Sequence, residues 1–155
     1  MSVYERIAEL LNSAEIAFDT LRHEPVYTSE EAARVRGAEL ASGAKALICK
    51  VDSRFVMFVM PADRKLASRE VRTQFQARSV RFASREEVAE LTGLQPGSIP
   101  PFGSLFNLPT YCDAALAAQP RINFNAGDHA ISINMSYADY AIAERPEIGT
   151  FSVSS

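Results

Sequence analysis

Two apolar segments in the first half of the chain constrain its fold more than any other feature. Residues 44–51 and 55–60 carry mostly apolar and β-prone side chains, and a short polar link around Asp52 and Ser53 joins them. Apolar runs on either side of such a link are typical of two paired strands. The sequence therefore predicts a buried β-hairpin over these two segments.

Helices are predicted on both sides of the hairpin. Thr28-Ser29-Glu30-Glu31 and Ser84-Arg85-Glu86-Glu87 are capping boxes, in which hydroxyl and carboxylate groups bind the free amides of a helix start. Glycine is a natural helix stop, so we expect these helices to end at Gly37 and Gly93. A third helix should start at Ser68 as its cap. The expected helices cover residues 3–12, 28–36, 68–75, 85–92 and 136–143.

Further strands complete a mixed fold. Alternating or apolar β-prone residues predict strands over 16–20, 79–82, 109–113, 121–124 and 130–135, with a turn at 125–128. No repeat, linker or low-complexity tract interrupts the chain. We therefore expect one α+β domain over residues 1–155.

Composition excludes several classes of protein. The chain has 155 residues, 47% of them hydrophobic and 23% charged, which is the size and balance of one globular domain. Its net charge of −3 argues against a wholly basic nucleic-acid binder but leaves room for a local basic face. The start of the chain does not resemble a signal peptide, and the longest apolar run is far shorter than the roughly 20 residues of a membrane span. We expect a cytoplasmic protein that has no membrane partner.

The segment from Gly93 to Gly103 has an unusual composition, with three glycines and three prolines in eleven residues. Such a composition is incompatible with a regular helix or a central strand. Glycines let backbone amides approach a ligand, and prolines keep a loop stiff. A rigid group of N–H donors is what an ester carbonyl needs when its oxygen becomes negative during hydrolysis. The alternative is a tight structural connection.

Lys45 enters an apolar strand directly after Gly43-Ala44. A lysine at such a position can reach a phosphate or a ribose as a point charge. The alternative is a surface lysine whose stem covers the strand edge.

Basic residues concentrate between Arg64 and Arg85. Seven of the sixteen bases lie in these 22 residues, against the single acid Glu70. Such clusters contact nucleic-acid phosphates, although a solvated surface has the same composition.

Side chains that could act as a nucleophile or hold a metal are scarce. Cys49 and Cys112 lie in apolar stretches and are expected to be buried thiols, which leaves a Cys112–His129 pair as a minor alternative. His23 has no evident partner. No metal-ligand spacing, Walker motif or dinucleotide motif occurs, so no metal or cofactor is predicted.

Five segments, in order, resemble the YbaK/prolyl-tRNA-synthetase-associated editing family. Each piece is short, but together they extend over nearly the whole chain. The departures are the adjacent Pro100 and Pro101 and the turn sequence Asn125-Ala126-Gly127, where the family often has two glycines. The matching segments are His23–Ala33, Lys45–Ile48, Thr92-Gly93 with Gly97–Gly103, Tyr111–Asp113 and Phe124–Gly127.

The resemblance implies a mixed, partly barrel-like sheet flanked by helices. It also implies hydrolysis of the ester between a wrong amino acid, such as Ala, Cys, Ser or Thr, and the 3′ end of tRNA, usually tRNA(Pro). Aminoacyl-tRNA is then the main partner, DNA is not expected, and an aminoacyl-tRNA synthetase stays open as a second partner. The resemblance assigns catalysis to Lys45, Gly97, Ser98, Ile99, Pro100, Pro101 and Gly103, and substrate binding to Tyr27, Thr28, Phe102, Asn125, Gly127 and His129.

From the basic run we assign tRNA binding to Arg64, Lys65, Arg69, Arg72 and Arg78. Two hypotheses about function remain at this point. The first is a trans-editing deacylase that needs no side-chain nucleophile, because an aminoacyl ester is already activated. The second is a non-catalytic tRNA- or nucleotide-binding regulator with the same fold.

Overall fold

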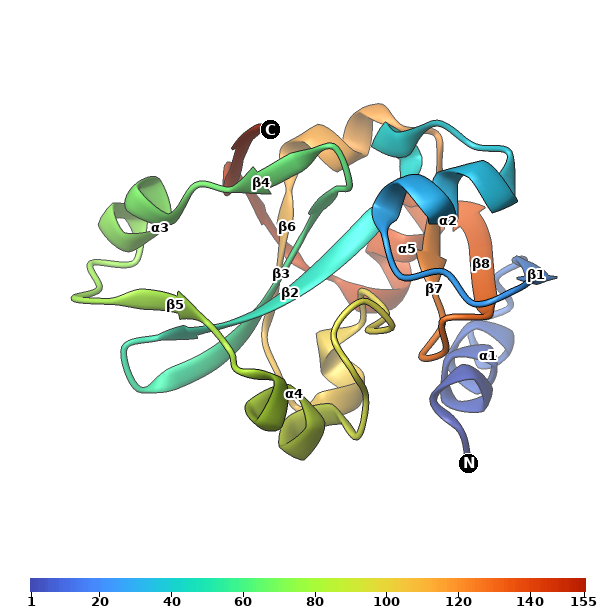
Figure 1. Ribbon diagram of the computed structural model, residues 1–155, viewed down its shortest axis with the longest axis horizontal. Helices are drawn as coiled ribbons and strands as arrows, with labels where there is room; N and C mark the ends of the chain where they lie inside the picture. The colour runs from blue at the N-terminus through green and yellow to red at the C-terminus, as the bar shows by residue number, and fades with distance from the viewer.

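The predicted hairpin forms the centre of the protein. The computed structural model describes residues 1–155, and strands β2 (Ala44–Val51) and β3 (Arg54–Pro61) pair antiparallel along their whole length (Figure 1). Three further strands extend this pair into a five-stranded sheet of order β5-β2-β3-β6-β9, in which β3, β6 and β9 run parallel. The added strands are β5 (Val80–Phe82), β6 (Thr110–Asp113) and β9 (Glu147–Gly149).

Two smaller sheets complete the β-structure. A three-stranded sheet has the order β1-β8-β7, and a two-stranded sheet pairs β4 with β10. A parallel bridge between Gly43 and Asn123 joins the start of β2 to β7. The α+β class is confirmed, but the main sheet stays open and does not close into a barrel. The strands are β1 (Asp19–Arg22), β4 (Arg64–Leu66), β7 (Arg121–Asn125), β8 (Ile131–Ser136) and β10 (Ser152–Ser154).

Strand β3 is buried on both faces, which explains its uninterrupted apolar sequence. Met57 and Val59 contribute to a core cluster of 20 buried residues on one side. Phe58 and Met60 contribute to a second cluster of 8 on the other side. Because successive side chains of a strand point to opposite faces, a single strand can supply both clusters.

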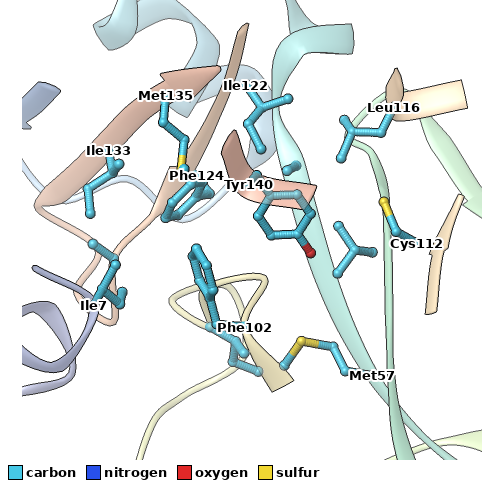
Figure 2. Close-up of a cluster of buried hydrophobic side chains, with 14 of the residues drawn as sticks. Ile7, Met57, Phe102, Cys112, Leu116, Ile122, Phe124, Ile133, Met135 and Tyr140 are labelled. Carbon is cyan, nitrogen blue, oxygen red and sulfur yellow. The ribbon is translucent and has the colours of Figure 1, made fainter. Parts of the chain in front are cut away.

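The larger cluster is centred on three aromatic rings. Phe102 packs edge-on against Phe124 and Tyr140, with ring centroids 5.6 and 5.3 Å apart (Figure 2). Phe102 belongs to the glycine- and proline-rich segment from Gly93 to Gly103, called the Gly/Pro loop below. Its contacts fix one end of that loop in the core.

The capping boxes form as predicted at Thr28 and Ser84, and Gly37 and Gly93 end their helices in the left-handed conformation. None of the helices is long and apolar enough to cross a membrane. The α-helices are α1 (Val3–Ser13), α2 (Ser29–Arg36), α3 (Ser68–Gln74), α4 (Arg85–Thr92) and α5 (Tyr137–Glu144), and three 3₁₀ helices are η1 (Leu40–Ser42), η2 (Gly103–Phe106) and η3 (Ala114–Ala118).

Some local predictions are wrong. The first strand covers Asp19–Arg22 instead of 16–20, because Ile16 turns into the core. Ser68 does not cap α3: Ala67 occupies the cap position and offers no side-chain hydrogen bond. The chain continues past α5 into β9 and β10, which were not predicted.

Candidate functional site

A pocket lies where the start of β2 comes close to the end of β7. Its volume is about 230 Å³, below the roughly 300–1,000 Å³ of sites for drug-sized ligands. The start of β2, the helices α2 and η1, the end of β7 and the Gly/Pro loop supply its walls. The lining residues are Tyr27, Thr28, Ser29, Ala32, Ala33, Arg36, Ala38, Glu39, Leu40, Gly43, Ala44, Lys45, Ala46, Leu47, Ala62, Gly97, Ile99, Phe124 and Asn125.

One face of α2 forms a wall of this pocket. Thr28, Ala32 and Arg36 follow each other at intervals of four residues, so they share that face. Thr28 also accepts a hydrogen bond from the backbone of Glu31, which fixes the helix start at the pocket edge. The small alanines of the wall leave room that larger side chains would fill.

Lys45 lines the pocket, as the sequence suggested for a ligand-binding lysine. It lies opposite Met60 in the hairpin, near the end of the sheet that faces α2. Burial lowers the pKa of Lys45, and the carboxylates of Asp63 and Glu30 oppose that change. The ammonium group is therefore a partly desolvated cation at the pocket wall.

The Gly/Pro loop enters the pocket through a tight turn. The amide of Ser98 donates to the carbonyl of Gln95 at 3.2 Å, which places Pro96 and Gly97 at the two central positions of the turn. Gly97 has φ +93°. A proline followed by a residue with positive φ is the pattern of a type II turn, where glycine is favoured because it has no Cβ.

Two amides of this loop have no acceptor within the protein. The backbone N–H groups of Gly97 and Ile99 donate to no protein atom, and both residues line the pocket. The other amides between 97 and 103 are bonded: that of Phe102 to Pro100 and that of Gly103 to Thr110. The loop thus carries two N–H donors without a protein acceptor, on residues that line the same pocket as Lys45.

The remainder of the loop anchors these donors instead of lining the pocket. Ser98 is buried, and its hydroxyl donates to the carbonyl of Gln95. The carbonyl of Pro101 accepts from the Tyr140 hydroxyl at 2.7 Å. A Cβ on Gly103 would come within 2.3 Å of the Thr110 hydroxyl, so only glycine fits there. Pro100 is buried too, so the segment from Ser98 to Gly103 is held from several sides.

An aromatic pair lies beside the loop. Tyr27 is 69% exposed, and its ring packs against His129 with centroids 4.7 Å apart. A Cβ on Gly97 would lie 3.6 Å from Nε2 of His129. Gly127 lines no part of the pocket. Its amide donates to the carbonyl of Ser98, and a Cβ there would collide with Val3.

Arg36 is a pocket residue that the sequence analysis did not identify. Its guanidinium donates to the Ser132 hydroxyl and to Oδ1 of Asn125, each at 2.9 Å. Burial lowers its pKa to about 10, so it is charged at neutral pH. The spacing of four residues from Thr28 through Ala32 to Arg36 was the available signal.

The cysteines offer no nucleophile. Both thiols are fully buried, and burial raises the pKa of Cys49 and of Cys112 to about 12. Cys112 packs in the core with Leu116 and Tyr140, whereas His129 packs against Tyr27. No group of three His, Cys, Asp or Glu side chains is arranged to hold a metal ion.

The basic run lies at the other end of the main sheet from α2. It follows β4, α3 and β5, in green in Figure 1. Arg64 is used structurally, since it donates to the hydroxyl and carbonyl of Ser152. Arg81 forms an ion pair with Glu87. The exposed cations left over are Lys65, Arg69, Arg72, Arg78 and Arg85.

Comparison with known proteins decides the family. Residues 23–142 match the family described as "Aminoacyl-tRNA editing domain". The chain belongs to this family. Within it, the chain is 33% identical over 153 residues to the multifunctional Ser/Thr-tRNA deacylase ProXp-y of Escherichia coli K12, covering 96% of this chain and 92% of the relative.

Editing-family sequences also occur inside larger enzymes. The chain is 33% identical over 118 residues to the proline–tRNA ligase of Bacillus licheniformis, which covers 74% of this chain but only 21% of the ligase. A crystal structure of a protein described as a candidate trans-editing enzyme for prolyl tRNA synthetase superposes with a TM-score of 0.82 at 22% identity, covering 99% of both chains. That likeness confirms the fold.

Proposed function

We propose that the protein hydrolyses mischarged aminoacyl-tRNA in trans. The observation that carries this proposal is the pair of unbonded amides at Gly97 and Ile99, two residues that line the same pocket as Lys45. Membership of the editing family and the likeness to a Ser/Thr-tRNA deacylase support it. In this proposal the aminoacyl group of the 3′-terminal adenosine enters the pocket with its ester beside the loop.

The two amides stabilise the negative charge that develops on the ester oxygen. Water supplies the new oxygen of the carboxyl group, the bond between the acyl carbon and the ribose oxygen breaks, and the ribose hydroxyl takes up a proton. Preorganised N–H donors can lower such a barrier by several kcal/mol. Neither thiol takes part in this step, because both cysteines are buried and protonated at neutral pH.

Lys45 and Tyr27 are suited to hold the tRNA end. The Lys45 ammonium can contact a phosphate or ribose of the terminal nucleotide as a point charge. The exposed ring of Tyr27, backed by His129, offers a surface on which a terminal base can stack. The exposed cations Lys65, Arg69, Arg72 and Arg78 would contact the tRNA backbone farther from the pocket.

The pocket favours a small acyl group. Six alanines and two glycines line it, and its volume is about 230 Å³. We therefore expect a substrate that carries Ala, Cys, Ser or Thr, and the likeness to proline–tRNA ligases favours tRNA(Pro) as its tRNA. Differences of one methyl or hydroxyl group are worth only about 1–3 kcal/mol in a pocket, so several of these are expected to react.

Two further inferences belong to this proposal. Residues 1–155 act as a single domain, since the larger core draws on side chains from Ile7 to Tyr140. The protein works in the cytoplasm, where its substrate is made, and a prolyl-tRNA synthetase is the natural supplier of that substrate.

The test is release of amino acid from a panel of tRNAs. Purified protein is mixed with tRNA(Pro) charged with Pro, Ala, Cys, Ser or Thr, and with tRNA(Ser) and tRNA(Thr) carrying their own amino acids. We expect hydrolysis of at least one mischarged tRNA(Pro) well above the spontaneous rate. Binding without hydrolysis of any member would favour the non-catalytic regulator.

A further inference from the structure

Arg36 carries a charge in the pocket wall that no carboxylate balances. The ion pairs of the protein join Arg81 with Glu87 and Arg121 with Asp19, and neither involves Arg36. Burying a cation without a counter-charge costs free energy, and hydrogen bonds from the cation to protein groups offset that cost. What Arg36 binds therefore indicates what it does.

The guanidinium bridges two neighbouring strands. Nε donates to Oγ of Ser132 on β8, and Nη2 donates to Oδ1 of Asn125 at the end of β7. Asn125 and Ser132 are opposite each other in the register of these strands. The planar fork of an arginine can reach both acceptors at once, whereas the single ammonium of a lysine is a poor substitute.

This contact fixes the orientation of the Asn125 side chain. An arginine only donates, so the amide oxygen must face Arg36 and the amide nitrogen must point away from it. That nitrogen, Nδ2, donates to the carbonyl of Gly97 at 2.7 Å. A chain of two hydrogen bonds thus leads from the end of α2 to the Gly/Pro loop.

The peptide unit between Gly97 and Ser98 is held at both ends. Asn125 binds its carbonyl oxygen, and the carbonyl of Gln95 binds its N–H group. The two unbonded amides, those of Gly97 and Ile99, are its immediate neighbours along the chain. Fixing this peptide restricts ψ of Gly97 and φ of Ser98, and these two torsions set how the flanking peptides that carry the two donors are oriented relative to each other.

We propose that Arg36 is a positioning residue, which acts through Asn125 to hold the Gly97–Ser98 peptide so that the flanking amides face the pocket. The inference deepens the proposed deacylation and rests on it. It differs from a direct role of Arg36 in binding a phosphate of the tRNA. A direct contact would act on substrate affinity, whereas a positioning role acts on the rate of the bound complex.

A double-mutant cycle separates these roles. The variants are Arg36→Met, which removes the donors at similar length, Asn125→Ala, and the two combined. Arg34→Met is the matched control, because Arg34 lies on the same helix turn but is exposed and outside the pocket. Single-turnover deacylation of the best mischarged tRNA gives the rate constant at saturation and the half-saturating concentration.

We expect each single change to lower the saturating rate roughly 10- to 100-fold, because a small displacement at a reacting centre can cost on the order of 100-fold. The half-saturating concentration should change less than about threefold. The double variant should lose little more than the worse single variant, since both act on one chain of contacts. Arg36→Lys should resemble Arg36→Met.

Three results would overturn the proposal. The first is a higher half-saturating concentration at an unchanged saturating rate, and the second is additive losses in the double variant. The third is full activity of Arg36→Lys, which would show that charge alone matters. Backbone amide resonances provide a second readout that needs no activity. Arg36→Met should shift the Gly97 and Ser98 signals, and unchanged signals contradict the relay. If Arg36→Met does not fold, Asn125→Ala is judged by the same rate and resonance criteria.

The proposed function and the positioning role can fail separately. A wild-type protein that hydrolyses no mischarged tRNA disproves the deacylase, and the amide resonances then still decide whether Arg36 holds the loop.

Discussion

Gly97 lies against the imidazole of His129, so that a Cβ at Gly97 would sit 3.6 Å from Nε2. The space therefore admits a methyl group, but the φ of +93° disfavours any side chain. Gly97→Ala should relax the turn toward negative φ and move the amide of Gly97 away from the pocket.

We expect Gly97→Ala to lower single-turnover deacylation at least about tenfold, because an oxyanion donor contributes several kcal/mol. Gly93→Ala is the matched control, since Gly93 also has positive φ (+74°) and ends α4 outside the pocket. Both variants should lose about 1 kcal/mol of stability, as expected for alanine at positive φ. Equal activity of the two variants would remove Gly97 from the reaction.

Lys45 should matter for the substrate and not for the fold. Lys45→Ala removes a partly desolvated cation that contacts phosphate or ribose, and losing a charge-assisted hydrogen bond costs roughly 1.5–3 kcal/mol. We expect the rate of deacylation, measured with tRNA below saturation, to fall at least about tenfold. Lys50→Ala is the control, because Lys50 lies on the same strand and packs over Phe55 away from the pocket. Wild-type activity of Lys45→Ala would exclude this role.

The thiols should be inert in the folded protein. Burial raises the pKa of Cys49 and Cys112 from 9.0 to about 12, so neither forms thiolate at pH 8. Iodoacetamide should modify no cysteine in the native state and two after denaturation, and activity should survive the treatment. Loss of activity in step with alkylation would point to a thiol mechanism.

The same raised pKa values predict how stability depends on pH. The folded thiols hold their protons to about pH 12, whereas the unfolded chain releases them above about 9.0. The contribution of these groups is therefore complete below pH 9.0 and is lost as the pH rises from there toward 12. Replacing Cys49 with alanine should weaken this alkaline loss of stability.

The basic run should affect tRNA affinity without affecting the chemical step. Arg69, Arg72 and Arg78 are exposed and form no ion pair. Their joint replacement by glutamine should flatten the dependence of log affinity on log salt by up to about 2–3, because fewer counterions are released. The saturating rate should stay at the wild-type value. An unchanged salt slope would identify the run as ordinary solvated surface.

Local sequence signals predicted most of the fold correctly. The hairpin of β2 and β3 and the capped helices α2 and α4 depend on neighbouring residues, and their bounds agree with the structure within a residue or two. Strands β4, β9 and β10 have three residues with one large apolar side chain each, so no alternating pattern appears, whereas the equally short β5 has two such side chains. Only their partners, far away in the sequence, define them.

The site was predictable only where a residue and its neighbours in the sequence carry the signal. Lys45 and Gly97 stand out by residue type and context, and the structure brings both to one pocket. Phe102 and Gly103 share the loop sequence but face the core, because packing against Phe124 and Thr110 decides their direction. Arg36 was not predicted because its hydrogen-bond partners lie 89 and 96 residues farther along the sequence.

The most direct test of the account is to observe the amides of Gly97 and Ile99 with a ligand bound. A stable analogue of the tRNA 3′ end, in which an anionic tetrahedral phosphonate replaces the aminoacyl ester, is titrated into ¹⁵N-labelled protein. If these N–H groups bind the developing oxyanion, their resonances should move downfield and show the largest changes in the protein. Saturable binding that shifts other pocket residues but leaves the Gly97 and Ile99 amides unmoved would contradict the account.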